Sequence, residues 1–170
     1  PVLTPGTSYS GAENQTAVGS VSASDADGDS LTFSISGSDL SVTSDGVLTF
    51  SSAPDYEANT SYAATLTVSD GTFSDSGSIT VNVTDVDDVA PVITSSATFT
   101  AAENQTAIGT VTATDVDSLS TSFSVSGEGL SMSTSGVLTF STAPDFETKS
   151  SYNGTITATD GINSSTQDIV

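Results

Sequence analysis

Apolar residues alternate with serine, threonine and other polar residues over short stretches of this chain. Leu31, Phe33 and Ile35 alternate in this way, and the same period of two recurs at residues 62–68 and 79–83. Because side chains two positions apart on a strand point to the same face, each stretch predicts a β-strand with one buried face. Glycine-containing turn signals separate the stretches, and no segment keeps a helical period over ten residues. The pattern therefore predicts an all-β protein.

The pattern occurs twice along the chain, with a constant offset of 90 residues. Residues 13–17 recur unchanged at 103–107, and residues 46–50 recur unchanged at 136–140. No insertion interrupts the register, so the sequence contains two copies of one domain. Each copy is predicted to fold as a Greek-key, immunoglobulin-like β-sandwich of about seven short strands.

The repeat sets the predicted domain boundaries. The first repeat is assigned to residues 1–88, with a linker at 85–91, and the second repeat to residues 89–170. Since Ile169-Val170 match Ile79-Thr80, the second repeat is expected to lack most of its last strand. We therefore expect it to be the less stable repeat, because a sheet without an edge strand exposes unpaired backbone groups.

Composition narrows the classes of function. Lys149 is the only basic residue against 21 Asp and Glu, and the formal net charge is −20. Proteins that bind nucleic acid gain most of their affinity from Lys and Arg, so no nucleic acid partner is predicted. The chain has no His and no Cys, which are the usual means of activating a nucleophile, so no enzyme activity is predicted. No apolar stretch is long enough to predict direct membrane insertion.

Most of the acidic residues fall in short motifs at fixed places in the repeat. In the first repeat the motifs are Glu13-Asn14, Asp25-Ala26-Asp27, Asp55-Tyr56-Glu57, Asp70, and Asp85-Val86-Asp87-Asp88 before Pro91. Two carboxylates about 5 Å apart repel each other by about 3 kcal/mol at an effective dielectric constant near 20, so a fold that gathers them needs a cation. Oxygen ligands without His or Cys favour Ca²⁺.

This order of motifs resembles the extracellular cadherin repeat, whose elements read xEN, DxD, DxE, an Asp after the sixth strand, and a DxNDxxP linker. The resemblance covers both copies over their full length. It implies a junction at which neighbouring repeats share about three Ca²⁺ ions. The implied side-chain ligands are Glu13, Asp55, Glu57, Asp87, Asp88, Asp115, Asp117 and Asp160, and the implied carbonyl ligands are Val86 and Val89.

The resemblance also implies two incomplete, weaker sites at the outer ends of the repeats. Their residues are Asp25, Asp27 and Asp70 in the first repeat and Glu103, Asp145 and Glu147 in the second. Two linker positions depart from the family pattern, because Asp87 stands where the family has Asn and Val89 where it has a second Asn. A further carbonyl ligand of the family is expected just after Asp117, where the loop is short, and it is not assigned. Asp85 is left outside the ligand set.

The resemblance implies a spacer or adhesion module that calcium stiffens, in a larger extracellular surface or secreted protein of the bacterial adhesin type. The membrane-associated parent would then contain further repeats as partners of these two. One alternative is a calcium-dependent module that binds carbohydrate or a second copy of itself, although a chain without Trp and with only four Tyr offers little platform for sugars. Another interpretation takes the acidic motifs as a solvated acidic surface, which the fixed order of the motifs disfavours.

Overall fold

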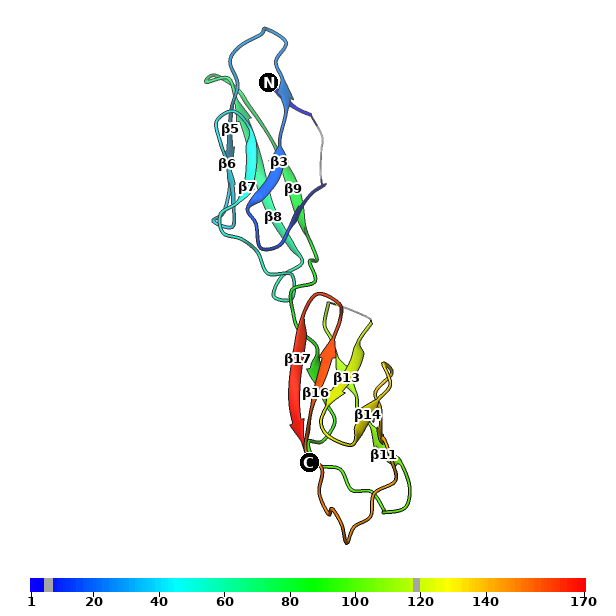
Figure 1. Ribbon diagram of the computed structural model, residues 1–170. Coiled ribbons are helices and arrows are strands. Elements are labelled where there is room, and N and C mark those ends of the chain that lie inside the picture. Colours follow the sequence, from blue (N-terminus) through cyan, green and yellow to red (C-terminus); the bar gives the residue numbers. More distant parts are fainter. Residues whose placement is uncertain (5–7, 118–119) are drawn as a thin grey trace. The chain divides into compact units, whose positions relative to one another are not determined.

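The computed structural model describes residues 1–4, 8–117 and 120–170. The chain divides into two compact units, Pro1–Val86 and Asp87–Val170 (Figure 1). Each unit is built from short β-strands, so the predicted all-β class is confirmed. Within the described ranges no helix is long and apolar enough to cross a membrane.

The first unit is a sandwich of two sheets. Its strands are β1 (Val2–Leu3), β2 (Ser8–Ala12), β3 (Ala17–Ser20), β4 (Ala23–Ser24), β5 (Thr32–Ile35), β6 (Leu40–Val42), β7 (Val47–Phe50), β8 (Ser61–Ser69) and β9 (Ser74–Thr84). One sheet has the order β2-β9-β8-β5 and the other has the order β3-β7-β6, while β1 pairs with β4. The strand β2 runs parallel to β9, and the other neighbouring pairs of these sheets are antiparallel.

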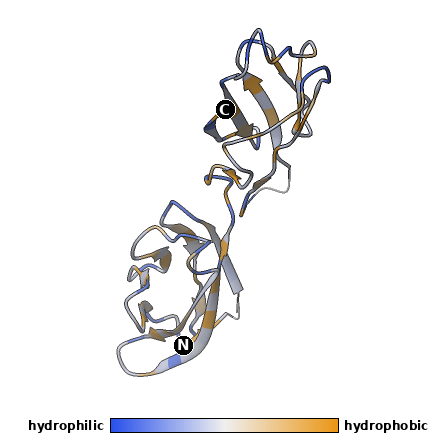
Figure 2. Cartoon of the chain, turned by 90° about the horizontal axis from the view of Figure 1, so that it is seen from below, coloured by the Kyte–Doolittle hydropathy of each residue, from blue (hydrophilic) through white to orange (hydrophobic). Residues whose placement is uncertain are grey.

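The core of the first unit lies between these two sheets. Leu48 and Phe50 of β7 belong to the same buried cluster as Leu66 of β8 and Val81 of β9. Along β8 and β9 the buried side chains alternate with half-buried or exposed polar residues, mostly Ser and Thr, as the period of two predicts. Figure 2 shows the alternation as orange bands along the strands.

The second unit repeats this architecture. Its strands are β10 (Val92–Ile93), β11 (Ala107–Thr110), β12 (Ala113–Thr114), β13 (Ser122–Ser126), β14 (Leu130–Met132), β15 (Val137–Phe140), β16 (Gly154–Thr159) and β17 (Ser164–Ile169). The sheets have the orders β13-β16-β17 and β11-β15-β14, and β10 pairs with β12. Val111, Leu138, Ile156 and Ile169 form its buried core.

The last strands of the two units differ in length. The strand β9 has 11 residues, and its segment Thr80–Thr84 pairs with β2. The strand β17 has six residues, and among the described residues none at 98–102 forms the counterpart of β2. The pairing between β16 and β17 likewise starts at Gly154 and Ile169, whereas β8 pairs with β9 from Ser61 onward.

The core of the second unit is less covered than that of the first. Leu40 and Phe50 are buried in the first unit, whereas their counterparts Leu130 and Phe140 are only half-buried. Leu130 and Phe140 line a cavity of about 310 Å³ together with Phe99. The second unit therefore removes less apolar surface from water at this end of its sandwich.

Candidate metal centre

Glu13 anchors the acidic cluster of the first unit. It follows β2 directly, and only 3% of its surface is exposed. Its Oε1 accepts a hydrogen bond from the N–H of Val86 at 2.8 Å, and its Oε2 accepts one from the N–H of Tyr56 at 2.7 Å. Asn14 has a φ of 60°, in the left-handed region that asparagine tolerates better than most residues, and its N–H donates to the carbonyl of Pro54 at 3.0 Å. The turn thus ties the segment after β9 and the 54–57 segment to one carboxylate.

Asp55 and Glu57 complete this cluster. One carboxylate oxygen from each of Glu13, Asp55 and Glu57 lies within 4.8 Å of the other two. Loss of hydration raises the pKa of Glu57, and the nearby charges of Glu13 and Asp85 raise it further. A cation bound among these oxygens would offset the negative charges of Glu13 and Asp85 and so remove their contribution to the raised pKa of Glu57.

The second unit gathers three aspartates from two loops. Asp115 and Asp117 follow β12, and Asp160 follows β16. Both oxygens of Asp115, Oδ1 of Asp117 and Oδ2 of Asp160 are buried and have no hydrogen-bond partner among the described residues. Buried polar atoms almost always have a partner, so these oxygens carry an unbalanced charge that a bound cation would satisfy.

Asp115 and Asp117 affect each other's titration. Loss of hydration raises the pKa of Asp115, and the adjacent carboxylate of Asp117 raises it further. The pKa of Asp117 is lowered instead, mainly because the N–H of Val89 donates to its carboxylate. A proton on Asp115 relieves the repulsion within the pair, and a divalent cation would take over this role.

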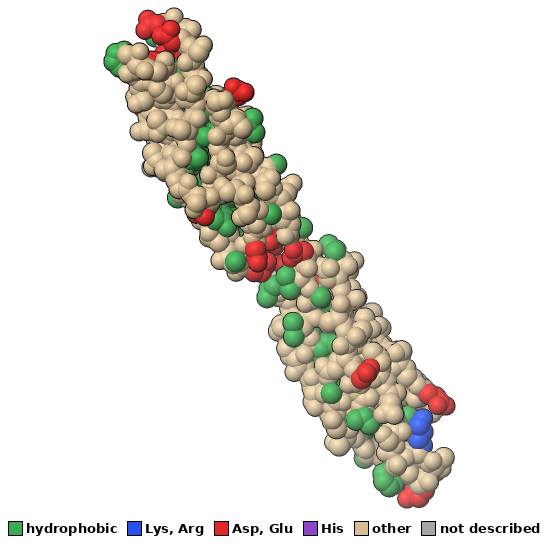
Figure 3. All heavy atoms as spheres, turned by 90° about the vertical axis from the view of Figure 1, so that its left-hand side faces the viewer, with side chains coloured by type: hydrophobic (Ala, Val, Ile, Leu, Met, Phe, Trp, Pro, Cys, Tyr) green, Lys and Arg blue, Asp and Glu red, His purple; other side chains and the backbone are tan. Residues whose placement is uncertain are grey.

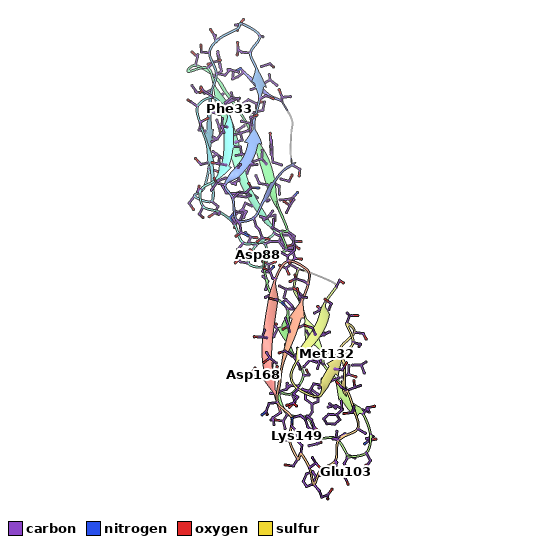
Figure 4. The ribbon with its side chains drawn as sticks, viewed as in Figure 1. Phe33, Asp88, Glu103, Met132, Lys149 and Asp168 are labelled. Carbon is purple, nitrogen blue, oxygen red and sulfur yellow. The ribbon has the colours of Figure 1, made fainter. Side chains whose placement is uncertain are left out.

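The linker residues of the second unit are held against these loops. Oδ2 of Asp117 accepts hydrogen bonds from the N–H groups of Asp88 and Val89, both at 2.9 Å. Figure 4 labels Asp88 at this end of the unit. Two successive backbone donors therefore hold the main chain of Asp88 and Val89 against Asp117 as the chain enters the unit.

The loop after β16 reaches the linker from a second side. Oδ1 of Asp160 accepts hydrogen bonds from the N–H groups of Ile162 and Asn163, both at 2.6 Å. The side-chain amide of Asn163 donates to the carbonyl oxygen of Asp87 at 3.4 Å and to Oδ1 of Asp87 at 3.3 Å. Asp87, Asp88, Asp115, Asp117 and Asp160 are therefore gathered in one region of the second unit.

The outer cluster of the first unit contains Asp25, Asp27 and Asp70, which line one cavity of about 320 Å³. The N–H groups of Asp27 and Gly28 donate to Oδ1 of Asp25 at 2.9 and 3.0 Å. The N–H groups of Phe73 and Thr72 donate to Oδ1 of Asp70, both at 2.7 Å, and these hydrogen bonds lower the pKa of Asp70. Backbone donors therefore hold the carboxylates of Asp25 and Asp70 in place.

The outer cluster of the second unit contains Glu103, Asp145 and Glu147, whose oxygens also lie within 4.8 Å of one another. Oε2 of Glu103 accepts a hydrogen bond from the N–H of Phe146 at 3.0 Å, as Glu13 does from Tyr56. All three acidic residues are exposed. Figure 4 labels Glu103 at the end of the unit opposite to Asp88, and Figure 3 shows acidic side chains in separate patches rather than spread over the visible surface.

The structure places each predicted ligand in one of these groups. Glu13, Asp55, Glu57 and Val86 belong to the first unit, and Asp87, Asp88, Val89, Asp115, Asp117 and Asp160 belong to the second. The sequence did not single out Asn163, although it stands at the position of Phe73 in the first repeat and this difference marks the loop. It also left out Asp85, whose charge acts on Glu57. Residues 118–119, where a further carbonyl ligand was expected, lie outside the described residues.

Comparisons with known proteins agree with this architecture. Residues 1–84 match a family described as bacterial Ig domain. The structure of human protocadherin-24 EC1-2 is similar over 99% of this chain and 92% of that chain, with a TM-score of 0.74 and 23% identity. No curated protein matches the chain in sequence.

Two longer structures are also similar. The human desmocollin-1 ectodomain has a TM-score of 0.77 and 18% identity, and the match covers 99% of this chain and 41% of that chain. Protocadherin gammaB7 EC3-6, in a cis-dimer structure, has a TM-score of 0.70 and 26% identity, and the match covers 99% of this chain and 48% of that chain. The predicted resemblance to tandem cadherin repeats is thus confirmed for the fold.

Proposed function

We propose that this chain, a tandem of two cadherin-like β-sandwich repeats, binds Ca²⁺ through its acidic clusters and serves as a spacer that calcium stiffens. The observation that carries the proposal is the set of buried oxygens on Asp115, Asp117 and Asp160 that have no donor among the described residues. The proposed setting is an extracellular surface or secreted protein. The proposed role is non-catalytic, because the chain has neither Cys as a nucleophile nor His as a base to activate one.

The chemistry of the donors supports Ca²⁺ over other metals. Every side-chain ligand is a carboxylate, and the chain has neither His nor Cys. Zinc and copper prefer nitrogen and sulfur ligands, whereas Ca²⁺ takes six to eight oxygens in flexible geometry. Mg²⁺ keeps several of its own waters and is seldom held by an all-protein cage. A crowded set of carboxylates and carbonyls therefore suits Ca²⁺ best.

The proposed ligands come from both repeats. Eight carboxylates, those of Glu13, Asp55, Glu57, Asp87, Asp88, Asp115, Asp117 and Asp160, would share about three ions with the carbonyls of Val86 and Val89. The ions would bring about six positive charges to eight negative ones, which leaves little net repulsion. Ligands supplied by both repeats to the same ions would leave the linker less free to move, which is the physical basis of the proposed stiffening.

A calorimetric calcium titration of the whole chain tests the metal site. We expect about three ions, and affinities in the range of about 10⁻⁴–10⁻³ M that extracellular modules show. Asp115→Asn should abolish most of this binding because it removes a charge and one of the buried oxygens. Asp168→Asn is the matched control, since Asp168 lies on β17 of the same unit, where its Oδ1 accepts a hydrogen bond from the hydroxyl of Thr155. Failure of the wild-type chain to bind at millimolar calcium would refute the proposal.

Small-angle X-ray scattering tests the spacer role separately. The distribution of conformations of the chain should be narrower in calcium than in EDTA. Asp88→Asn should behave in calcium as the wild-type chain behaves in EDTA. If calcium binds but the scattering is the same in both conditions, the metal site stands and the stiffening role is wrong.

A further inference from the structure

We infer that Asn163 is a positioning residue that holds Asp87 ready for the cation. This inference rests on the proposed function, because it concerns one of the proposed ligands. The amide nitrogen of Asn163 lies 3.3 Å from Oδ1 of Asp87 and 3.4 Å from its carbonyl oxygen. Both partners are acceptors, so the NH₂ group rather than the amide oxygen has to face them.

The main chain of Asn163 is fixed independently of this contact. Its N–H donates to Oδ1 of Asp160 at 2.6 Å, and its carbonyl accepts a hydrogen bond from the hydroxyl of Thr159 at 2.7 Å. Asn163 therefore connects two proposed ligands, Asp160 through its backbone and Asp87 through its side chain. The side chain is partly buried at the contact.

The first repeat shows that the turn itself does not require asparagine. Phe73 occupies the same position, and its N–H donates to Oδ1 of Asp70 at 2.7 Å. Its carbonyl accepts a hydrogen bond from Ser69, as that of Asn163 does from Thr159. The ring of Phe73 is 71% exposed. Since the turn forms with either residue, the turn does not account for the amide of Asn163, whose side-chain hydrogen bonds among the described residues go to Asp87.

This role is to order a ligand before the metal arrives. Asp87 lies in the linker, and an aspartate side chain loses conformational freedom when it binds a cation. A hydrogen bond that already selects one orientation removes part of that loss, as outer partners of metal ligands do. Such partners change metal affinity by about 10- to 100-fold, and the long contacts here favour the lower end, about tenfold.

The test replaces Asn163 by the residue of the first repeat. Asn163→Phe and Asn163→Leu should each weaken calcium binding about tenfold in calorimetry. Asn153→Leu is the matched control, because Asn153 is exposed and lies before β16, at the other end of that strand from Asp160. In the wild-type chain the side-chain ¹H–¹⁵N signals of Asn163 should shift on calcium binding with the same midpoint as the calorimetric titration. In EDTA both Asn163 variants should unfold at the wild-type temperature.

Each outcome has one meaning. Wild-type affinity in both Asn163 variants would overturn the positioning role while leaving the proposed calcium site intact. Loss of affinity together with a lower unfolding temperature in EDTA would overturn it as well, because the residue would then be structural. No binding by the wild-type chain would remove the proposed function and this inference with it.

Discussion

Calcium should stabilise this chain against heat by an amount that follows from the affinity and the number of ions. A ligand that binds only the folded state adds RT ln(1 + [L]/Kd) for each site. At about 10 mM calcium and a Kd of about 10⁻⁴–10⁻³ M, each ion contributes about 1.4–2.7 kcal/mol, and three ions contribute about 4–8 kcal/mol. A change of 1 kcal/mol shifts the unfolding temperature of a domain of this size by about 4–8 °C. We expect the second unit to gain most, because it supplies six of the ten proposed ligands.

Differential scanning calorimetry in EDTA and in 10 mM calcium measures this effect. A chain of net charge −20 gains stability from any salt that screens its repulsion, so the reference samples need matched ionic strength from KCl and from MgCl₂. Asp115→Asn should lose most of the calcium-dependent shift, and Asp168→Asn should keep it. An equal rise in unfolding temperature with Mg²⁺ and Ca²⁺, or no rise beyond that in KCl, would refute the reasoning.

Three further predictions concern single residues. Glu13→Gln should destabilise the first unit by about 1–3 kcal/mol in chemical denaturation, because a buried oxygen that accepts a hydrogen bond from Tyr56 or Val86 becomes an NH₂ group. Glu103→Gln at the exposed counterpart should change the stability of the second unit by less than about 0.5 kcal/mol, and equal effects of the two substitutions would contradict the burial argument. Phe50→Ala should lower the free energy of unfolding of the first unit by about 3–5 kcal/mol in denaturant titrations. Phe140→Ala should lower that of the second unit clearly less, since Phe140 is only half-buried and lies beside a cavity. Equal losses would show that the cavity is filled in solution. In calcium-free protein, ¹³C carboxyl NMR should show Asp115 keeping its proton to a higher pH than Asp117, because the folded-state pKa of Asp115 is raised and that of Asp117 is lowered. Calcium favours the charged form and should lower the titration midpoint of Asp115. Coincident midpoints of the two residues without calcium would contradict these opposite pKa shifts.

The fold could be predicted from the sequence because two of its signals are visible along the chain. The period of two in residues 79–83 becomes the buried face of β9, and the offset of 90 residues becomes two units of the same architecture, apart from the missing counterpart of β2. The different burial of Phe50 and Phe140 could not be read from these signals. The two residues lie in identical segments, and their burial depends on strand pairing with residues distant in sequence.

In the acidic clusters, too, some features are visible in the spacing along the chain and others depend on contacts between distant segments. The DxE segment at 55–57 and the DxD segment at 115–117 could be found because their spacing is visible along the chain. The contact of Asn163 with Asp87 joins residues 76 positions apart, so no spacing rule indicates it. The double role of Glu13, which accepts from Tyr56 and Val86, also depends on where β2 and β9 end.

The separation of the acidic clusters from the two cores bears on what loss of calcium would do. Most of the buried core side chains lie on strands, whereas Asp115, Asp117 and Asp160 lie in loops that follow strands. Repulsion among loop carboxylates in the absence of a cation therefore acts first on loops and on the linker residues that they hold, such as Asp88 through Asp117. Each sandwich keeps its buried apolar contacts, so we expect far-ultraviolet circular dichroism of the chain to be the same in EDTA and in calcium. Hydrogen exchange at the N–H groups of Asp88 and Val89 should instead slow when calcium is added, because these donors bond to Asp117, which would then be fixed by the metal. A loss of strand signal in EDTA would mean that the clusters support the cores directly, and the calcium ions would then be part of the fold rather than a control on the linker.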